Sequence, residues 1–382
     1  MTEGNSLVAS ELLSEPIQQH GIHNMPSVPF SCSSSPKLPE LLSKLKCSVA
    51  ISTYQAGKII FISAENNTRL TMLARNFINP MGFEIKEDKM VLATKDEIVF
   101  FENSKTLAAH YPNKKNTYDN LFLPRATFYT GQVDIHDIAF GADGIWAVNT
   151  SFSCICRVTG NYNFIPVWKP PFISEIVCED RCHLNGMVML HGKPKYVTAL
   201  GNTNTLFGWK ENLVNSGVLI DVDTNEIILE KLCVPHSPML YKDELYLLLS
   251  GTGEIVKVDI QKRKYEVVAQ TDGFCRGMDI YDEYIFVGMS KLRQNSSSFS
   301  KISFKDNNYA AGVKIYHLPT GAFVGEIAYE TSVEEIYGLK IIENAVRPNI
   351  LNTTDPIYKY SLSIPNHAYW AKDAEKMNIK SL

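Results

Sequence analysis

The chain has 382 residues, of which 45% are hydrophobic and 20% charged, and its formal net charge is −4. This composition is typical of an ordinary globular protein with enough apolar material for a core, and the charge gives no reason to expect nucleic acid or an anionic membrane as partner. No apolar run approaches the roughly 18–20 residues that a membrane helix needs.

The cysteines and the N-terminus together predict the compartment. The first 20 residues have neither the basic region nor the apolar region of a secretory signal. The eight cysteines contain no CxxC pair, which argues against a zinc ribbon or a thioredoxin-type motif. Small buried thiols in a reducing environment are the favoured interpretation, so we expect a cytoplasmic protein.

The two ends of the chain differ from its middle. Residues 1–40 are rich in Ser, Pro, Gln and His without a periodic pattern, so we expect a flexible or loosely docked arm. The stretch 38–46 predicts one short amphipathic helix. Residues 41–345 predict short β-branched and aromatic strands separated by Gly, Asn and Asp turns. Residues 346–382 are rich in turns and proline, and we expect a tail without strands that packs on the rest.

The predicted strands recur in units of about four. Each unit is too small to bury its own faces, and recurrence at roughly 40–55 residues is the signature of propeller blades. The five complete units span 82–103, 137–168, 186–232, 238–270 and 277–329.

A sixth unit is divided between the two ends of the repeat. The stretch 335–342 predicts an innermost strand, and its three missing partners are available at 48–53, 58–64 and 69–76. Pairing them closes the ring and removes open sheet edges. The sequence therefore predicts an all-β protein, a six-bladed β-propeller whose C-terminal strand pairs with N-terminal strands.

The innermost strands share one polar position. Each has a polar or ionisable residue four places before a bulky apolar one, and the starts of innermost strands surround one mouth of the central channel. We therefore expect these residues to form a ring. They are Asn79, His136, His183, His236, Arg276 and Glu335.

Other side chains are predicted near the same mouth. Besides Asn79, the candidate substrate-binding residues are Asn149, Asn185 and Lys291, with Arg125 upstream of His136, although a structural loop contact is the simpler role for Arg125. Two long connections, 201–217 and 290–312, leave this rim, and long loops on one face are typical of lids or binding loops. Trp209, in the first loop, is expected to pack between blades, with covering a ligand as the alternative role.

Three histidines from successive blades suggest a metal. Imidazole suits a divalent transition metal such as Zn or Fe, and three ligands with one open position is the arrangement of catalytic sites. His136, His183 and His236 are the candidate ligands. The competing interpretation is that they are hydrogen-bonding groups lining a polar channel.

The remaining ring residues are candidates for catalysis. Arg276 carries a permanent planar charge and would anchor a carboxylate or phosphate, unless it is simply paired with Glu334 or Glu335. Asp137 or Glu335 would act as acid or base. Cys182, near a ring histidine, is favoured as a packing residue rather than a nucleophile.

The stretches "EDRCHLNG" (179–186) and "PHSP" (235–238), with "DIHDIAF" and "CRGMDI", resemble a bacterial family of conserved hypothetical proteins that has a domain of unknown function. The resemblance covers about residues 75–350; it implies a propeller and no particular reaction. The chain is more loosely similar to six-bladed propellers of the gluconolactonase and strictosidine-synthase kind. Those lactonases use Glu, Asn and Asp ligands, and the His-rich ring departs from that pattern.

Two functions are therefore predicted. The first is a metal-dependent enzyme of hydrolase, lyase or isomerase type that acts on a small anionic molecule or peptide at the channel mouth. The alternative is a non-catalytic propeller that binds a ligand or protein partner through the same face. There is no GxGxxG or GK[ST] motif in the required context, so we expect no nucleotide. The sequence does not predict an oligomeric state.

Overall fold

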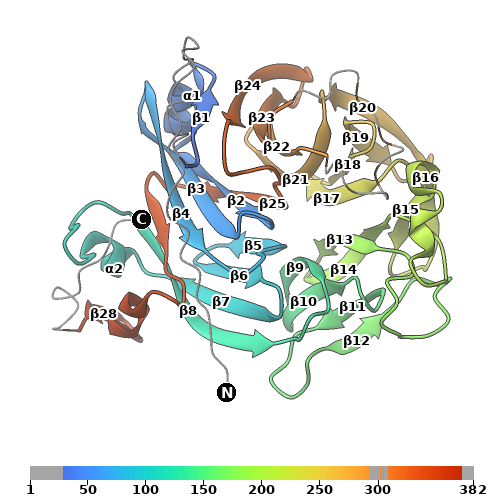
Figure 1. Cartoon of the computed structure of the whole chain (residues 1–382), viewed down its shortest axis with the longest axis horizontal. Coiled ribbons are helices and arrows are strands. Elements are labelled where there is room, and N and C mark those ends of the chain that lie inside the picture. The colour runs from blue at the N-terminus through green and yellow to red at the C-terminus, as the bar shows by residue number, and fades with distance from the viewer. Residues whose placement is uncertain (1–28, 293–298, 300–301, 303, 305–308, 372–382) are drawn as a thin grey trace, which may run out of the picture.

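The strands of the computed structural model form six antiparallel sheets arranged around a central axis (Figure 1). The structure describes residues 29–292, 299, 302, 304 and 309–371. Within each blade, one strand lies nearest the axis and the following strands lie progressively further out, towards the rim. The predicted all-β, six-bladed propeller is confirmed.

Blade 1 closes the ring with strands from both ends of the chain. Its innermost strand is β25 (Gly338–Glu343), followed outward by β2 (Cys47–Thr53), β3 (Lys58–Asn66) and β4 (Arg69–Asn76). The strands β25 and β2 are antiparallel, in a register that pairs Ser52 with Gly338 and Cys47 with Glu343. This is the closure that the divided sixth unit predicts.

The other blades follow in chain order, each built from the axis outward. Blade 2 is β5 (Phe83–Lys86), β6 (Lys89–Ala93), β7 (Glu97–Asn103) and β8 (Asn120–Tyr129); blade 3 is β9 (Ile135–Gly141), β10 (Gly144–Asn149), β11 (Cys154–Arg157) and β12 (Ile165–Trp168). Blade 4 is β13 (Leu184–Leu190), β14 (Lys193–Ala199), β15 (Gly217–Asp221) and β16 (Ile227–Leu232). Blade 5 is β17 (Pro235–Tyr241), β18 (Glu244–Leu249), β19 (Glu254–Asp259) and β20 (Lys264–Gln270). Blade 6 is β21 (Phe274–Tyr281), β22 (Tyr284–Ser290), β23 (Gly312–His317) and β24 (Ala322–Tyr329).

Segments outside the repeat cover two outer edges. The short strand β1 (Cys32–Ser34) pairs with β24, and β26 (Pro348–Ile350) pairs in parallel with β8. Helix α1 (Leu38–Leu45) confirms the predicted amphipathic helix and buries Leu38 and Leu42 against blades 1 and 6. Added terminal strands satisfy backbone groups that an open edge would expose. Residues 1–28 of the expected arm lie outside the described residues.

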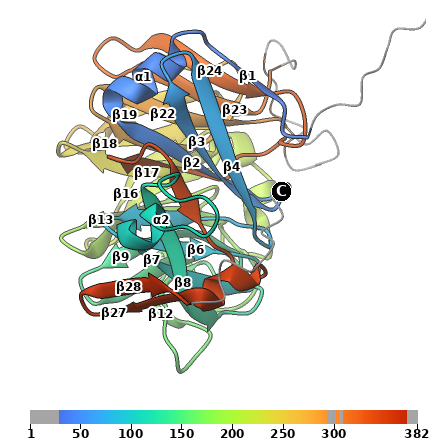
Figure 2. The ribbon, with the colours of Figure 1, turned by 90° about the vertical axis from the view of Figure 1, so that its left-hand side faces the viewer.

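The expectation that the tail lacks strands was wrong. Besides β26, it contains η4 (Pro356–Tyr360) and a hairpin of β27 (Ser361–Ile364) and β28 (His367–Trp370). The hairpin contacts α2 (Lys105–Ala109), where the Trp370 indole donates to the carbonyl oxygen of Leu107 at 3.0 Å. Figure 2 shows the hairpin at the outer edge of the propeller. These strands have three or four residues, too few to show a period, and they add no seventh blade.

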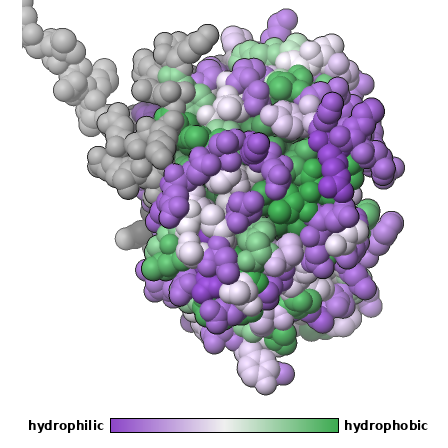
Figure 3. Space-filling model, turned by 90° about the vertical axis from the view of Figure 1, so that its right-hand side faces the viewer, coloured by the Kyte–Doolittle hydropathy of each residue, from purple (hydrophilic) through white to green (hydrophobic). Residues whose placement is uncertain are grey.

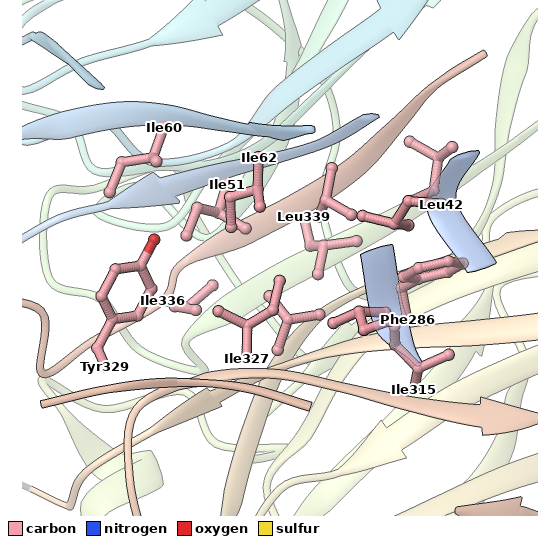
Figure 4. Packing of buried hydrophobic residues seen from close by; sticks show 14 of the residues in the cluster. Leu42, Ile51, Ile60, Ile62, Phe286, Ile315, Ile327, Tyr329, Ile336 and Leu339 are labelled. Atoms are coloured by element: carbon pink, nitrogen blue, oxygen red, sulfur yellow. The ribbon is translucent and has the colours of Figure 1, made fainter. Parts of the chain in front are cut away.

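The apolar core lies between blades. Six clusters of buried residues each combine side chains from two neighbouring blades. At the junction of blades 6 and 1, Ile51 and Leu339 face Ile315 and Ile327 (Figure 4). The outer surface is mixed: the side that carries β16 shows apolar patches among polar residues (Figure 3). Among the described residues, no helix is long and apolar enough to cross a membrane.

Buried hydroxyl groups connect neighbouring blades near the axis. At four junctions a Ser or Thr at the end of one blade's second strand donates to a backbone carbonyl where the next blade's innermost strand begins. The pairs are Ser52 to Met81, Thr150 to Leu184, Ser250 to Cys275 and Ser290 to Ile336. These bonds fix the positions of the strand starts relative to one another.

Ring closure depends on the packing of β25, which gives a first prediction. Leu339 is 2% exposed, so Leu339→Ala removes buried apolar volume that the neighbouring blades cannot easily refill. We expect it to lower the free energy of unfolding by about 2–5 kcal/mol in urea denaturation. Ile78 is 64% exposed, so Ile78→Ala, the control, should change it by less than about 0.5 kcal/mol. Equal losses in the two variants would contradict this account of closure.

Candidate functional site

A cavity of about 280 Å³ lies where the innermost strands begin. Polar residues from five blades line it, together with apolar side chains from the loops above. The lining residues are Tyr54, Met81, Asp134, His136, His183, Leu200, Trp209, His236, Phe274, Arg276, Ser290, Lys291, Leu292, Phe299, Glu335 and Tyr337. We call this the mouth cavity.

Five of the six predicted ring residues line the mouth cavity. They are His136, His183, His236, Arg276 and Glu335. Asn79 does not, because β5 begins only at Phe83 and Asn79 lies in the preceding loop, where its amide donates to the carbonyl of Tyr54 at 3.3 Å. In blade 2 the cavity is lined by Met81 instead.

The imidazoles of blades 3 and 4 are in direct contact. The ring centroids of His136 and His183 are 4.7 Å apart, with the ring planes nearly perpendicular. His236 is 3% exposed, and its ring lies edge-on to Phe274 at 6.0 Å. The repeat therefore brings three imidazoles to one cavity, as the alignment of strands predicts.

Each imidazole has a protein partner at Nδ1. His136 Nδ1 lies 3.2 Å from the carbonyl oxygen of Asp134, and His183 Nδ1 lies 2.9 Å from Asp180 Oδ2. His236 Nδ1 lies 2.9 Å from Ser250 Oγ, whose own proton goes to the carbonyl of Cys275. Because these partners act as acceptors, Nδ1 carries the proton in each neutral ring and Nε2 keeps a lone pair for a ligand.

Burial keeps two of the imidazoles neutral. Desolvation, followed by the charges of His183 and Arg276, holds the pKa of His136 well below its ordinary value. Desolvation and Arg276 do the same to the pKa of His236. Near neutral pH, these two rings therefore offer acceptors and add no positive charge to the cavity.

His183 is held by a carboxylate that sequence analysis missed. Asp180 Oδ2 accepts from His183 Nδ1 at 2.9 Å and from the Trp209 indole at 3.0 Å, and the His183 and Trp209 rings are 4.3 Å apart. Asp180 and His183 both have positive φ, 44° and 50°, in the left-handed region that Asp and His adopt more readily than most residues. The only sequence signal was an aspartate three residues before a ring histidine.

Arg276 lies on an aromatic platform. Its guanidinium carbon is 3.4 Å from the centre of the Tyr337 ring, and Nη1 is 4.0 Å from Glu335 Oε1. The arginine side chain is 13% exposed and that of Glu335 is 17% exposed. Tyr337 was also missed, although it lies two places after Glu335 and immediately before β25.

A second cavity of about 280 Å³ continues into the channel, and it shares His136, His236, Arg276 and Tyr337 with the mouth cavity. Asp137 faces this channel cavity rather than the mouth. Its carboxylate accepts the backbone N–H groups of Met187 at 2.8 Å and Ile138 at 2.9 Å, so it connects blades 3 and 4. Burial raises the pKa of Asp137 to about 6.

The candidate substrate-binding residues are dispersed. Lys291 lines the mouth cavity and is exposed. Asn185 lines the channel cavity, bonded to the carbonyl of Pro235 and the hydroxyl of Thr198. Asn149 is fully buried, and its Oδ1 accepts from the backbone of Phe152.

Arg125 does not reach the mouth. It lies on β8, the fourth strand of blade 2, and donates to Ser363 Oγ at 2.6 Å. The sequence of this segment, 123–137, is typical of a loop because Pro124 interrupts the strand pattern; in the structure, Pro124 lies at a register shift between β7 and β8.

The two long loops differ in how far they are described. Loop 201–217 contains η1 (Gly208–Lys210) and η2 (Leu213–Asn215) and lines the mouth cavity through Trp209, which is 5% exposed. Most of the 293–308 part of the other loop lies outside the described residues, so its predicted role as a lid stays a prediction. Burial raises the pKa of Cys182 to about 12, as expected for a packing thiol.

The metal prediction has mixed support. The donor set fits chemically, since three rings with Nδ1 bonded retain Nε2 for a metal. Within the described part of the chain, however, no group of three or more His, Cys, Asp or Glu side chains is arranged to hold an ion. Metal binding therefore stays a prediction.

The raised pKa of Asp137 gives a pH prediction. An unfolded chain releases this proton near pH 4, whereas the folded protein holds it to about pH 6. The folded state therefore binds more protons between these values, and the stability that Asp137 contributes is lost as the pH rises through 6. From pH 5 to 7, the free energy of unfolding of the wild type should fall by about 1 kcal/mol more than that of Asp137→Asn.

Urea denaturation at several pH values measures this difference. His136 and His236 titrate in the opposite direction, but they do so in both proteins and cancel in the comparison. Leu339→Ala, which removes no titrating group, should keep the wild-type dependence. Identical slopes for wild type and Asp137→Asn would show that this carboxyl titrates normally.

Comparisons with known proteins identify the family. A family model described as Domain of unknown function (DUF4915) matches residues 36–351, while no curated protein matches the chain. A solved nidogen/laminin complex contains a similar chain, with a TM-score of 0.50 and 13% identity over 77% of this chain and 98% of that one. At this identity the likeness shows the fold alone. The expected kinship is confirmed: the chain belongs to the DUF4915 family.

Proposed function

We propose that this protein binds a small anionic organic molecule in the mouth cavity, with Arg276 as the anchor of the anionic group. The observation that supports this most is the placement of Arg276. It is a permanent cation with its side chain only 13% exposed, and it lines the wall shared by the mouth and channel cavities. Glu335 lies at 4.0 Å, the outer limit of an ion pair, and leaves much of the guanidinium fork available to a ligand.

The histidines complete the recognition. The Nε2 atoms of His136, His183 and His236 are hydrogen-bond acceptors, so they favour a ligand that also has hydroxyl or amine protons. Trp209 and Phe274 supply apolar walls. Small-molecule sites have this combination of a mainly apolar cavity with a few placed polar groups.

The same groups suit acid–base chemistry. Asp180 accepts a hydrogen bond from His183 Nδ1 and fixes the ring, so His183 Nε2 is the best-placed base in the cavity. Glu335 is the second candidate acid or base and also lines the cavity. Hydrolase, lyase and isomerase reactions of the bound molecule are all compatible with this pair. Asp137, which points its oxygens at backbone N–H groups, is a less suitable candidate.

Metal-dependent catalysis is the second candidate. It is favoured by the three bonded Nδ1 atoms, which fix each ring as a metal-ligating histidine usually is. A bound divalent metal would act as a Lewis acid next to Arg276. We also propose a cytoplasmic location, supported by the buried thiols of Cys47, Cys154, Cys156, Cys182 and Cys275.

The binding proposal predicts a loss of affinity in one variant. Thermal shift and calorimetry with small carboxylates, phosphate esters and sulfates should identify anions that bind the wild type. Arg276→Met keeps an apolar stem over Tyr337 but removes the charge, and we expect it to weaken binding by about 30-fold or more, equivalent to 2–5 kcal/mol. Arg263→Met, on a distant exposed ion pair with Glu226, is the control and should bind normally. Undiminished binding to Arg276→Met, or no binding of any anion to wild type, would refute the proposal.

The metal candidate has its own measurement. If it is right, elemental analysis of the purified protein should find close to one transition-metal ion per chain, and His183→Ala should lose it. Zinc titration of the metal-free protein gives the same comparison by calorimetry. Absence of metal, together with zinc binding that is unaffected when all three histidines are replaced by alanine, would eliminate this candidate and leave anion binding intact.

A further inference from the structure

Tyr337 has a buried polar atom that no residue in the described part of the chain satisfies. The residue is 6% exposed, and its hydroxyl has no hydrogen-bond partner among the described residues. A buried phenol normally finds a partner, and leaving it without one costs roughly 1–3 kcal/mol. Because Tyr337 lines both the mouth and the channel cavities, a molecule bound there is the natural acceptor for its proton.

The cation beside this hydroxyl is Arg276. With its guanidinium carbon 3.4 Å from the ring centre, the arginine covers the face of the ring while the hydroxyl lies at the rim. The two donor groups therefore lie within a few ångströms of each other, in the wall that the mouth and channel cavities share. A carboxylate has two oxygens able to accept from both at once.

The charges favour a monoanion over a phosphate ester. Arg276 is already partly balanced by Glu335 at 4.0 Å, and Asp134 also lines the cavity. Among the described residues that line the cavity, the other cation is Lys291, which is exposed. The inner end therefore offers at most one compensating positive charge, so a dianionic phosphate would keep at least one uncompensated buried charge.

The walls and volume of the mouth cavity determine the polarity and size of the part of the ligand beyond the carboxylate. Above the ring, Leu200, Trp209 and Phe274 belong to one buried apolar cluster. A cavity of about 280 Å³ has the volume of roughly nine waters, so it suits a ligand of about ten non-hydrogen atoms. The body that fits these walls is apolar and about the size of one six-membered ring.

We propose that the ligand is a small monocarboxylate with a ring-sized body that is apolar apart from one hydroxyl or amine group, and that its carboxylate accepts hydrogen bonds from Arg276 and from the Tyr337 hydroxyl. This inference rests on the proposed function and specifies its ligand. The carboxylate lies inward, towards the channel, and the apolar body lies outward against Trp209. Tyr337 is then the residue that makes the site specific for carboxylates.

Calorimetry with matched probes tests the proposal on the full chain. Benzoate, phenylacetate and 3-phenylpropionate, each with and without a ring hydroxyl, are the carboxylate probes; their amides are uncharged controls, and phenyl phosphate is the dianionic control. We expect at least one carboxylate to bind wild type at least tenfold more tightly than its amide and than phenyl phosphate. Tyr337→Phe should weaken that carboxylate about tenfold or more, because a hydrogen bond to a charged group is lost.

The unfolding temperature of the ligand-free protein shows whether the Tyr337 hydroxyl serves ligand binding or the stability of the fold. Because the Tyr337 hydroxyl has no partner in the described protein, Tyr337→Phe should leave the unfolding temperature of the ligand-free protein unchanged or raise it. Thr150→Val, which removes a buried hydroxyl bonded to the carbonyl of Leu184, is the matched control and should lower it. A drop of several degrees in Tyr337→Phe would assign its hydroxyl to the fold and overturn the proposal.

The binding results also distinguish the ligand class from anion binding in general. If phenyl phosphate or another anion binds more tightly than every carboxylate, and Arg276→Met abolishes that binding, the ligand class is wrong while anion binding stands. The ligand class is equally wrong if carboxylates bind Tyr337→Phe as tightly as wild type. If no anion of any class binds, both proposals fail.

Discussion

The buried hydroxyl bonds between blades are the interaction on which the site depends. Three of the four that we describe end on the residue next to a functional side chain: Thr150 fixes Leu184 beside His183, Ser250 fixes Cys275 beside Arg276, and Ser290 fixes Ile336 beside Tyr337. Each bond satisfies a buried carbonyl that would otherwise cost free energy. These bonds hold the ionisable side chains within a few ångströms of one another around the axis. Because they join hydroxyl groups to backbone carbonyls, the polar atoms of the ionisable side chains stay available to a ligand.

One of these bonds also determines the chemistry of a ring residue. Ser250 donates its hydroxyl proton to the carbonyl of Cys275, so its oxygen accepts a hydrogen bond from His236 Nδ1. A contact between two blades therefore determines that Nδ1, rather than Nε2, carries the proton of this imidazole. In blade 4 the same result is reached through Asp180, which also holds Trp209. Equivalent positions in the repeat therefore reach the same tautomer through different partners, a carboxylate in blade 4 and a hydroxyl in blade 5.

Sequence predicted the repeat and the ring better than it predicted the contacts around them. Closure through β25 and five of the six mouth residues follow from strand spacing alone, because a period-two pattern and a radial repeat leave few other arrangements. The predicted place of Asn79 in the ring was wrong because β5 is only four residues long and begins after Asn79. The predicted place of Arg125 near the mouth was wrong because Pro124 interrupts the strand pattern of β8, so the segment was interpreted as a loop. Asp180 and Tyr337 were missed for a different reason. Their roles come from side chains that meet across blades or across a loop, and no spacing within one segment encodes that.

The polar groups of the mouth differ in kind between its two sides. Blades 3, 4 and 5 contribute imidazoles whose Nε2 atoms accept hydrogen bonds, whereas blades 6 and 1 contribute the guanidinium of Arg276 and the hydroxyl of Tyr337, which donate them, next to the Glu335 carboxylate. A symmetric ion or a water column would gain nothing from such a division. A molecule with an anionic end and a protonated end gains from both halves, and it can do so in one orientation only. This asymmetry, produced by a nearly symmetric fold, is the strongest physical reason to regard the mouth as a binding site rather than as a solvated opening.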